Sequence, residues 1–263
     1  MKRVLTGLIL IPTFAYVTIW APLQVFLASA AIAGLLCFRE YGGLVAHHNL
    51  RQPGLSGYVA GLLLLLLPLE PTLIFVVLIA LLALALAMTS RDLAYALPFA
   101  ATLVLGVLYV FGCLRAGVDL RKLTPLGTRG EYWLFFSLSV SWIGDSAAYY
   151  FGRLMGRHKL APRISPAKSW EGAIASTIVS LVYAYFFFKY LLPPVPLPWV
   201  LGIAATANIA GQVGDLCESA IKRGAGVKDS GAMLPGHGGW LDRIDSNLFA
   251  MPVVYYLAGF VGR

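Results

Sequence analysis

The sequence predicts an all-α polytopic membrane protein with about nine transmembrane helices, because its composition does not fit a soluble fold. Apolar residues make up 59% of the 263 residues and charged residues 12%. A typical soluble domain has about 45–50% apolar and about 25% charged residues. The mean hydropathy is +0.78. Polar side chains are too few to cover a soluble surface, so most of the protein must face lipid.

Nine apolar runs approach the length of about 20 residues that a transmembrane helix needs. They are Val4–Trp20, Pro22–Phe38, Leu55–Leu69, Thr72–Thr89, Leu93–Leu114, Tyr132–Tyr150, Gly172–Leu192, Leu197–Val213 and Asn247–Val261. Leu55–Leu69 is short, so we expect a short span or half of a hairpin with its neighbour. The first run follows Met1-Lys2-Arg3 as in a signal peptide, but no small-x-small cleavage site follows it. This indicates a retained hairpin of two spans.

The positions of Lys and Arg predict that the N-terminus and the polar site face the cytoplasm. With the N-terminus inside, the inner segments hold 14 of the 20 Lys and Arg residues, in agreement with the positive-inside rule. The segment from Arg115 to Arg129 is the exception, with four positive residues outside. A different span count before it would invert the first half of the chain.

We expect one integral membrane domain over residues 1–263, with an apolar scaffold half at 1–131 and a catalytic half at 132–263. The net charge of +8 suits cytoplasmic loops near anionic lipid or a site for anionic substrates. Nucleic acid is not expected as a partner, since the basic residues are scattered between apolar runs. Cys37, Cys113 and Cys217 have neither disulfide nor metal-site spacing and are interpreted as packing residues.

Carboxylates at the ends of two apolar runs are the first candidate site residues. Asp145 lies inside a run, where a charge is costly and indicates function; pairing with a cation at the interface is the alternative. If a helix continues past Asp215, then Asp215, Glu218, Ser219 and Lys222 share one face. Taken alone, that face is better explained as a solvated helix end with a Glu218–Lys222 pair.

The segment before the last run combines a glycine-rich turn with two more carboxylates. Gly236-His237-Gly238-Gly239 is a turn whose backbone can approach an anion closely. Asp242 and Asp245 are three residues apart and share a helix face. Their repulsion favours a Mg²⁺ ion between them, and helix capping by Asp is the alternative. Carboxylates, lysines, arginines and glycine turns together suit phosphoryl or nucleotidyl transfer.

The residues from Ser219 to Asp245 resemble the full signature of the phosphatidate cytidylyltransferase family. The matching parts are Ser219-Ala-Ile-Lys222-Arg223, Lys228-Asp229-Ser230-Gly231 and Leu234-Pro-Gly-His-Gly-Gly-Trp-Leu-Asp-Arg-Ile-Asp245. Gly144–Tyr149 and Ile164–Gly172 resemble the same family, with Ser169 where Thr is expected. The resemblance covers residues 132–263 at the level of motifs.

This resemblance implies an enzyme that makes CDP-diacylglycerol and pyrophosphate from CTP and phosphatidate in phospholipid biosynthesis. It implies Mg²⁺, with K⁺ as a possible second cation, and a homodimer among membrane lipids. We expect a bacterial inner membrane with the active site toward the cytoplasm. The implied metal ligands are Asp215, Asp242, Asp245 and Asp145, and the catalytic residues are Asp215, Lys222, Asp242 and Asp245. The expected substrate-binding residues are Arg163, Ser165, Lys168, Ser219, Arg223, Lys228, Gly236, His237, Gly238, Gly239 and Arg243.

Two other classes of function stay open from the sequence. A CTP-dependent kinase acting on a lipid alcohol could use a similar site, but it would release CDP and a lipid phosphate. An ion-coupled transporter would place its acids near the middle of the spans, whereas these acids lie at span ends. A structural scaffold leaves the clustered Gly, Asp and Lys residues unexplained.

Overall fold

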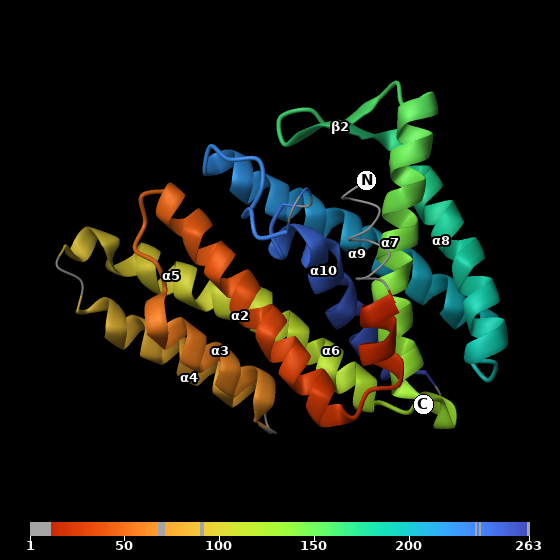
Figure 1. Cartoon of the computed structure of the whole chain (residues 1–263), viewed down its shortest axis with the longest axis horizontal. Coiled ribbons are helices and arrows are strands. Elements are labelled where there is room, and N and C mark those ends of the chain that lie inside the picture. The colour runs from red at the N-terminus through yellow and green to blue at the C-terminus, as the bar shows by residue number, and fades with distance from the viewer. Residues whose placement is uncertain (1–11, 68–71, 90–91, 235, 237, 262–263) are drawn as a thin grey trace. The chain divides into compact units, whose positions relative to one another are not determined.

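The computed structural model describes residues 12–67, 72–89, 92–234, 236 and 238–261, and it is almost entirely helical. Residues 12–19 are helical, and the predicted run Val4–Trp20 otherwise begins outside the described residues. The following elements are α2 (Leu23–His47), α3 (Gly54–Leu66), α4 (Thr72–Ala87), η1 (Leu93–Tyr95), α5 (Ala96–Gly106), η2 (Val107–Gly112), α6 (Cys113–Lys122) and η3 (Pro125–Gly127). They continue with α7 (Gly130–Met155), β1 (Lys159–Ala161), β2 (Ser165–Ser169), α8 (Trp170–Leu191), α9 (Leu197–Gly224) and α10 (Leu241–Ala258) (Figure 1).

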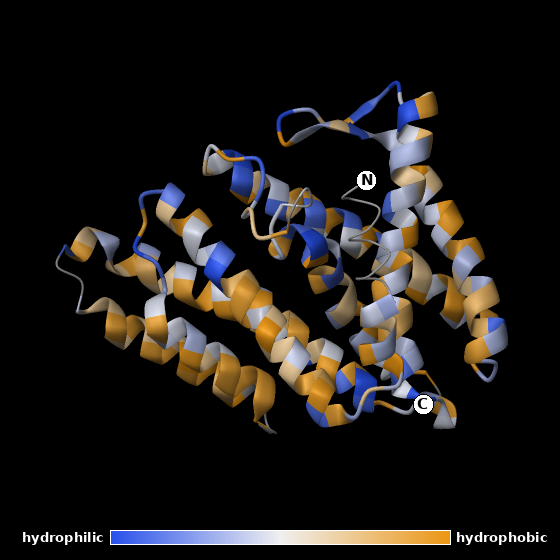
Figure 2. Cartoon of the chain, in the orientation of Figure 1, coloured by the Kyte–Doolittle hydropathy of each residue, from blue (hydrophilic) through white to orange (hydrophobic). Residues whose placement is uncertain are grey.

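In the described residues, every predicted span from Pro22 onward lies mostly in a helix, in agreement with an all-α membrane-like fold. In the described part of the chain, four helices are long and apolar enough to cross a bilayer. They are Leu23–His47, Leu93–Lys122, Trp170–Leu191 and Leu197–Gly224, and Gly54–Leu66 and Ile74–Ala87 are shorter apolar helices. Figure 2 shows apolar residues along α3 and α4 and polar residues in the ribbon of β1 and β2. The total of nine spans stays a prediction.

One predicted boundary differs from the structure. The run Leu93–Leu114 was expected to end at Leu114, but the helix continues to Lys122. Arg121 explains part of this extension, because its Nε donates to the carbonyl oxygen of Thr18 at 3.0 Å and its Nη2 to that of Ala21. A basic residue that satisfies carbonyl groups can lie within a helix at the end of an apolar stretch.

The chain forms two compact units, and the boundaries after Arg115, Ala220 and Arg243 fall inside helices. Apart from the N-terminal residues, the first unit contains Pro22–Arg115 and Ile221–Arg243, and the second contains Ala116–Ala220 and Ile244–Arg263. The segment around the glycine-rich turn therefore packs with the helices of the N-terminal half.

Aromatic side chains fill the core of the first unit between α2, α3 and η2. The rings of Phe38 and Phe111 lie 5.4 Å apart and both are buried. Gly61 faces the Phe111 ring so closely that a Cβ atom would collide with it. In lipid no hydrophobic effect drives helices together, so their association depends on close packing. Small residues at the contacts permit that close approach.

A polar network joins α8 and α9 inside the second unit. The Asn208 Nδ2 donates to Ser176 Oγ at 2.9 Å and Ser180 Oγ at 3.0 Å, and Asn208 Oδ1 accepts from Thr177 Oγ1. Gly144 of α7 faces the same amide with no room for a Cβ atom. Interhelical hydrogen bonds of this kind hold membrane helices together, and Figure 1 shows α7 and α8 running side by side.

The only strands in the described residues form a two-stranded antiparallel ribbon between α7 and α8. In this ribbon Lys159 pairs with Ser169 and Ala161 with Ser165. The sequence does not mark these strands, because a short segment rich in Pro, Lys and Ser has no apolar alternation. The ribbon gives Ser165 and Lys168 a defined backbone.

Candidate active site

The predicted site residues fall on four local structures. Asp145 lies in α7, and Ser165 and Lys168 lie in β2 with Arg163 in the turn before it. The C-terminal part of α9 carries Asp215, Ser219, Lys222 and Arg223. The following loop and the start of α10 carry Lys228, Gly236, Gly238, Gly239, Asp242, Arg243 and Asp245. His237 lies outside the described residues.

Four carboxylates gather in the second unit, and we call them the four-carboxylate cluster: Asp145, Asp215, Glu218 and Asp245. Asp245 is 9% exposed and Glu218 is fully buried. Burial, followed by the negative charges of the other three, raises the pKa of Asp245 well above its ordinary value. The protonated form of Asp245 is therefore favoured next to these carboxylates.

Lys168 partly balances this charge from the ribbon. Its Nζ lies 2.5 Å from Asp215 Oδ2, and both side chains are about one quarter exposed, at 27% and 28%. The hydroxyl of Ser219 donates to Asp215 Oδ1 at 3.3 Å, as expected for residues four apart on one helix face. This ion pair brings Lys168 of the ribbon motif into contact with Asp215 at the end of α9.

Two contacts hold the ribbon in place at the start of α8. Glu171 Oε1 lies 2.6 Å from His158 Nδ1 and also accepts from the His158 backbone N–H. Ser169 caps α8, because its Oγ accepts from the N–H of Gly172. The hydroxyl that Ser169 keeps in place of the expected Thr therefore has a structural role.

In the first unit, Asp242 lies at the centre of a second group of residues. We call Glu40, Lys222, Ser230, Gly239 and Asp242 the Asp242 cluster. Asp242 Oδ1 lies 2.6 Å from Lys222 Nζ, and its Oδ2 accepts from Ser230 N at 2.9 Å, Ser230 Oγ at 3.0 Å and Gly239 N at 2.7 Å. The side chains of Lys222 and Asp242 are only 9% and 5% exposed.

These contacts give Asp242 a capping role. Burial by itself raises the pKa of Asp242, but the Lys222 ammonium and the N–H groups of Gly239 and Ser230 outweigh it. The pKa of Asp242 therefore lies below its ordinary value. The alternative of helix capping is supported, since Asp242 satisfies an N–H group just before α10.

The glycine-rich turn has the backbone that the sequence predicted. Gly236 and Gly238 have φ angles of +76° and +77°, a region that strongly favours glycine. The N–H of Gly239 donates to Asp242, and a Cβ atom on Gly238 would lie 2.7 Å from Asp242 Oδ2. The turn therefore wraps closely around a carboxylate of its own chain.

Glu40 of α2 is a site residue that the sequence analysis missed. It is 6% exposed and accepts hydrogen bonds from Ser230 Oγ at 2.9 Å, Trp240 N at 3.0 Å and Leu241 N at 2.8 Å. A single acid next to Arg39 at the end of an apolar run looks like an interface residue. Only its burial against a loop 190 residues away identifies it.

The remaining predicted cations lie at the surface. Arg163, Lys228 and Arg243 are exposed, and Arg223 donates to the carbonyl oxygen of Val227 at 2.8 Å. Exposed cations remain accessible to a phosphorylated ligand, whereas Lys222 is buried with Asp242.

The four-carboxylate cluster has the donor chemistry that Mg²⁺ requires. Hard cations take carboxylate oxygens, and one or two are sufficient for Mg²⁺ when substrate phosphates supply the rest. Among the residues that the structure describes, no three His, Cys, Asp or Glu side chains are grouped so as to hold one ion. The cluster therefore supplies oxygen atoms of the kind that Mg²⁺ takes, although these side chains are not arranged around one ion position.

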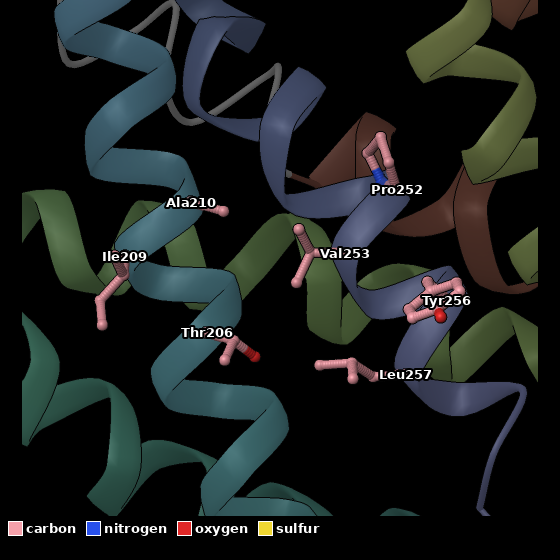
Figure 3. Close-up of a pocket in the computed structure, with 7 residues that line it drawn as sticks. All are labelled: Thr206, Ile209, Ala210, Pro252, Val253, Tyr256 and Leu257. Carbon is pink, nitrogen blue, oxygen red and sulfur yellow. The ribbon is translucent and has the colours of Figure 1, made fainter.

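An apolar pocket of about 530 Å³ lies between α9 and α10 in the second unit. Its lining residues are Thr206, Ile209, Ala210, Pro252, Val253, Tyr256 and Leu257. Figure 3 shows Thr206 and Ala210 of α9 pointing toward Val253 and Leu257 of α10. The small side chains on α9 leave space between the two helices.

Paired lysines and carboxylates on apolar helices indicate a functional site in a membrane protein. The comparison with known proteins identifies the family: the chain matches the cytidylyltransferase family over residues 1–261 and belongs to it.

Relatives of nearly the same length support this assignment. The phosphatidate cytidylyltransferase of Bacillus subtilis (strain 168) is 34% identical over 267 residues, covering 97% of this chain and 96% of the relative. That of Staphylococcus aureus (strain COL) is 32% identical, with 97% of each chain covered. The Staphylococcus saprophyticus protein of the same name is 43% identical over 141 residues, 54% of each chain. The family resemblance is confirmed, and the chain is an enzyme.

Proposed function

We propose that the protein transfers the cytidylyl group of CTP to phosphatidate, giving CDP-diacylglycerol and pyrophosphate. The similarity over nearly the full length to relatives named for this reaction carries the proposal. The pairing of Lys168 with Asp215 supports it, since a motif lysine lies at the carboxylates.

The reaction needs charge neutralisation more than it needs a base. A phosphate oxygen of phosphatidate attacks the α-phosphorus of CTP, and the bond from that phosphorus to the β-phosphate oxygen breaks. Pyrophosphate leaves with the electron pair of that bond. The nucleophile is already an anion near neutral pH, so the main barrier is repulsion between two polyanions.

The basic residues of the motifs supply the opposite charge. We assign Lys168 and Arg163 to the lipid phosphate, and Arg223 and Lys228 to the phosphates of CTP. Lys222 is assigned to the CTP phosphates as well, and it would have to leave its buried pair with Asp242 to reach them. Arg163 and Lys228 are exposed, and Lys168 can exchange Asp215 for a phosphate oxygen because their pair is only partly buried. Ser165, Ser219 and Arg243, together with the glycine turn, complete the proposed binding residues.

Mg²⁺ is the proposed cofactor, and Asp145, Asp215 and Asp245 would hold it. A bound Mg²⁺ neutralises phosphate charge and orients the leaving group. The proximity of Asp215 and Asp145 to Asp245 supports this assignment, because a cation would relieve the repulsion among their carboxylates. Asp242 is the other acid that the signature implies as a ligand, and it would have to give up its pair with Lys222 to hold the ion. K⁺ as a second cation stays a prediction.

We further propose that the enzyme acts in a bacterial inner membrane as a homodimer, with its site toward the cytoplasm. The four apolar helices and the bacterial relatives support an integral membrane protein. The sidedness rests on the 14 of 20 basic residues in the inner segments.

A dual-label assay tests the reaction. Purified protein in detergent receives Mg²⁺, phosphatidate and a lipid alcohol, with CTP labelled in the cytidine or at the γ-phosphate. We expect the cytidine label in the lipid phase and the γ label in pyrophosphate. Transfer of the γ label to the alcohol would identify a kinase and overturn the proposal. If neither label moves, with or without K⁺, the proposal is also wrong.

A further inference from the structure

We propose that Glu40 is a positioning residue that fixes the loop between α9 and α10 and, through Ser230, the carboxylate of Asp242. This inference rests on the proposed function, because that loop carries residues assigned to CTP. The contacts that carry it all lie within the first unit.

The first step is the hydrogen bonding at the N-terminus of α10. Helix N-termini have N–H groups without partners inside the helix. Two carboxylates accept hydrogen bonds from three consecutive backbone N–H groups here. Gly239 N donates to Asp242, while Trp240 N and Leu241 N donate to Glu40. The carboxylate of Glu40 thus fixes where α10 begins.

The second step is the hydroxyl group of Ser230. It lies 2.9 Å from Glu40 Oε2 and 3.0 Å from Asp242 Oδ2, and one hydroxyl proton serves one acceptor at a time. The two acids are therefore coupled through a single side chain. A change at Glu40 alters the hydrogen bonding that holds Asp242 against Lys222.

The third step is the closeness of the backbone to Glu40. A Cβ atom on Gly231 would lie 2.6 Å from Glu40 Oε1, and one on Gly239 would collide with Oε2. Both glycines belong to the signature segments, so their lack of a side chain provides the space that the Glu40 carboxylate occupies. A buried carboxylate with fixed donors is rigid because losing any donor is costly.

The test uses the full-length protein with Glu40→Gln, which keeps the shape but removes the charge. We expect the KM for CTP to rise at least tenfold while the KM for phosphatidate stays within twofold. Hydrogen–deuterium exchange should become faster at residues 238–241. Glu40→Asp should recover part of the loss, because it restores the charge.

Glu131→Gln is the matched control. Glu131 is likewise a glutamate within a helix, but it lies in the first turn of α7 and pairs with exposed Arg129 at 3.5 Å. It should leave KM values and exchange at residues 238–241 unchanged. Wild-type KM and wild-type exchange in Glu40→Gln would overturn the proposal. If that variant does not fold, Ser230→Ala decides, and the same unchanged results there overturn it.

Failure of the proposed function would be visible separately. If the wild-type protein makes no CDP-lipid, that function is wrong, yet the exchange measurement still decides whether Glu40 fixes the loop.

A different observation carries a second inference: we propose that the pocket between α9 and α10 binds one acyl chain of the phosphatidate substrate. This too rests on the proposed function. The residues that face each other, Ala210 with Val253 and Thr206 with Leu257, show that α9 and α10 run antiparallel along the pocket.

The same two helices carry three members of the four-carboxylate cluster, Asp215, Glu218 and Asp245, toward one end of this pocket. Ala210 precedes Asp215 by five residues and Pro252 follows Asp245 by seven, about 7.5 and 10 Å along a helix. The apolar lining then continues away from the carboxylates on both helices. A lipid whose phosphate lies near Lys168 would direct a chain into this space.

Ala210→Phe fills the pocket, and Leu201→Phe is the control at an exposed position on the opposite side of α9. With dipalmitoyl phosphatidate, we expect Ala210→Phe to raise KM at least fivefold. Dihexanoyl phosphatidate should stay within twofold, because its chains end near the start of the pocket. The control should resemble the wild type with both lipids.

An equal change with both lipids, or no change with either, would overturn the acyl-chain assignment. Wild-type turnover of both lipids in the same series shows independently whether the proposed reaction occurs.

Discussion

Asp242→Asn should destabilise the protein far more than Asp215→Asn, although each change removes one carboxylate charge. The Asp242–Lys222 side chains are 5% and 9% exposed, whereas those of Asp215 and Lys168 are 28% and 27% exposed. Breaking a buried ion pair by removing one partner costs about 3–5 kcal/mol. A partly exposed pair contributes about 0.2–1 kcal/mol.

These free energies translate into separate melting temperatures. For chains of about 150–250 residues, 1 kcal/mol shifts Tm by about 2–4 °C. Asp242→Asn should therefore lower Tm in detergent by about 6–20 °C, and Asp215→Asn by less than about 4 °C. Under the proposed function both variants lose turnover, which we would measure well below either melting transition.

A double variant separates charge from packing. Adding Lys222→Met to Asp242→Asn removes the uncompensated buried charge, so stability should recover in part while turnover should not. Equal Tm losses for the two single variants would refute the reasoning. The reasoning would also be refuted if the double variant lost as much stability as Asp242→Asn and Lys222→Met together, each measured as a single variant.

Three further changes test the second unit and the metal. Gly144→Ala should cost about 1–3 kcal/mol, because its Cβ would collide with the amide of Asn208; an unchanged Tm would contradict the tight contact. Glu171→Ala should leave Tm nearly unchanged but speed tryptic cleavage within the ribbon, since His158 loses its partner, and wild-type cleavage would show that the contact is dispensable. Chelation by EDTA should abolish turnover and added Mg²⁺ should restore it; turnover that persists in chelator would argue against the metal.

The family signature could be predicted from sequence because its residues are adjacent in the chain. The turn at Gly236 and Gly238 has the expected positive φ angles, and Ser219 bonds to Asp215 as their spacing requires. Such local features follow from backbone periodicity and glycine conformation.

Contacts between distant segments could not be predicted in the same way. Glu40 bonds to Leu241 across 201 positions, and no local pattern marks that acid. Pairing of Lys168 with Asp215 likewise depends on a ribbon that has no apolar alternation. The spacing of Asp242 fitted both metal binding and helix capping. Only the hydrogen bonds that it accepts show that it bonds to the Gly239 N–H and to Lys222.

The sequence by itself determined that this is a helical membrane enzyme of the cytidylyltransferase family. Composition requires lipid as the solvent, and each span satisfies its own backbone hydrogen bonds. Tertiary structure alone decided which charges are buried and which partners neutralise them. A charge tolerates burial only where specific donors converge on it, and that convergence depends on how distant helices pack.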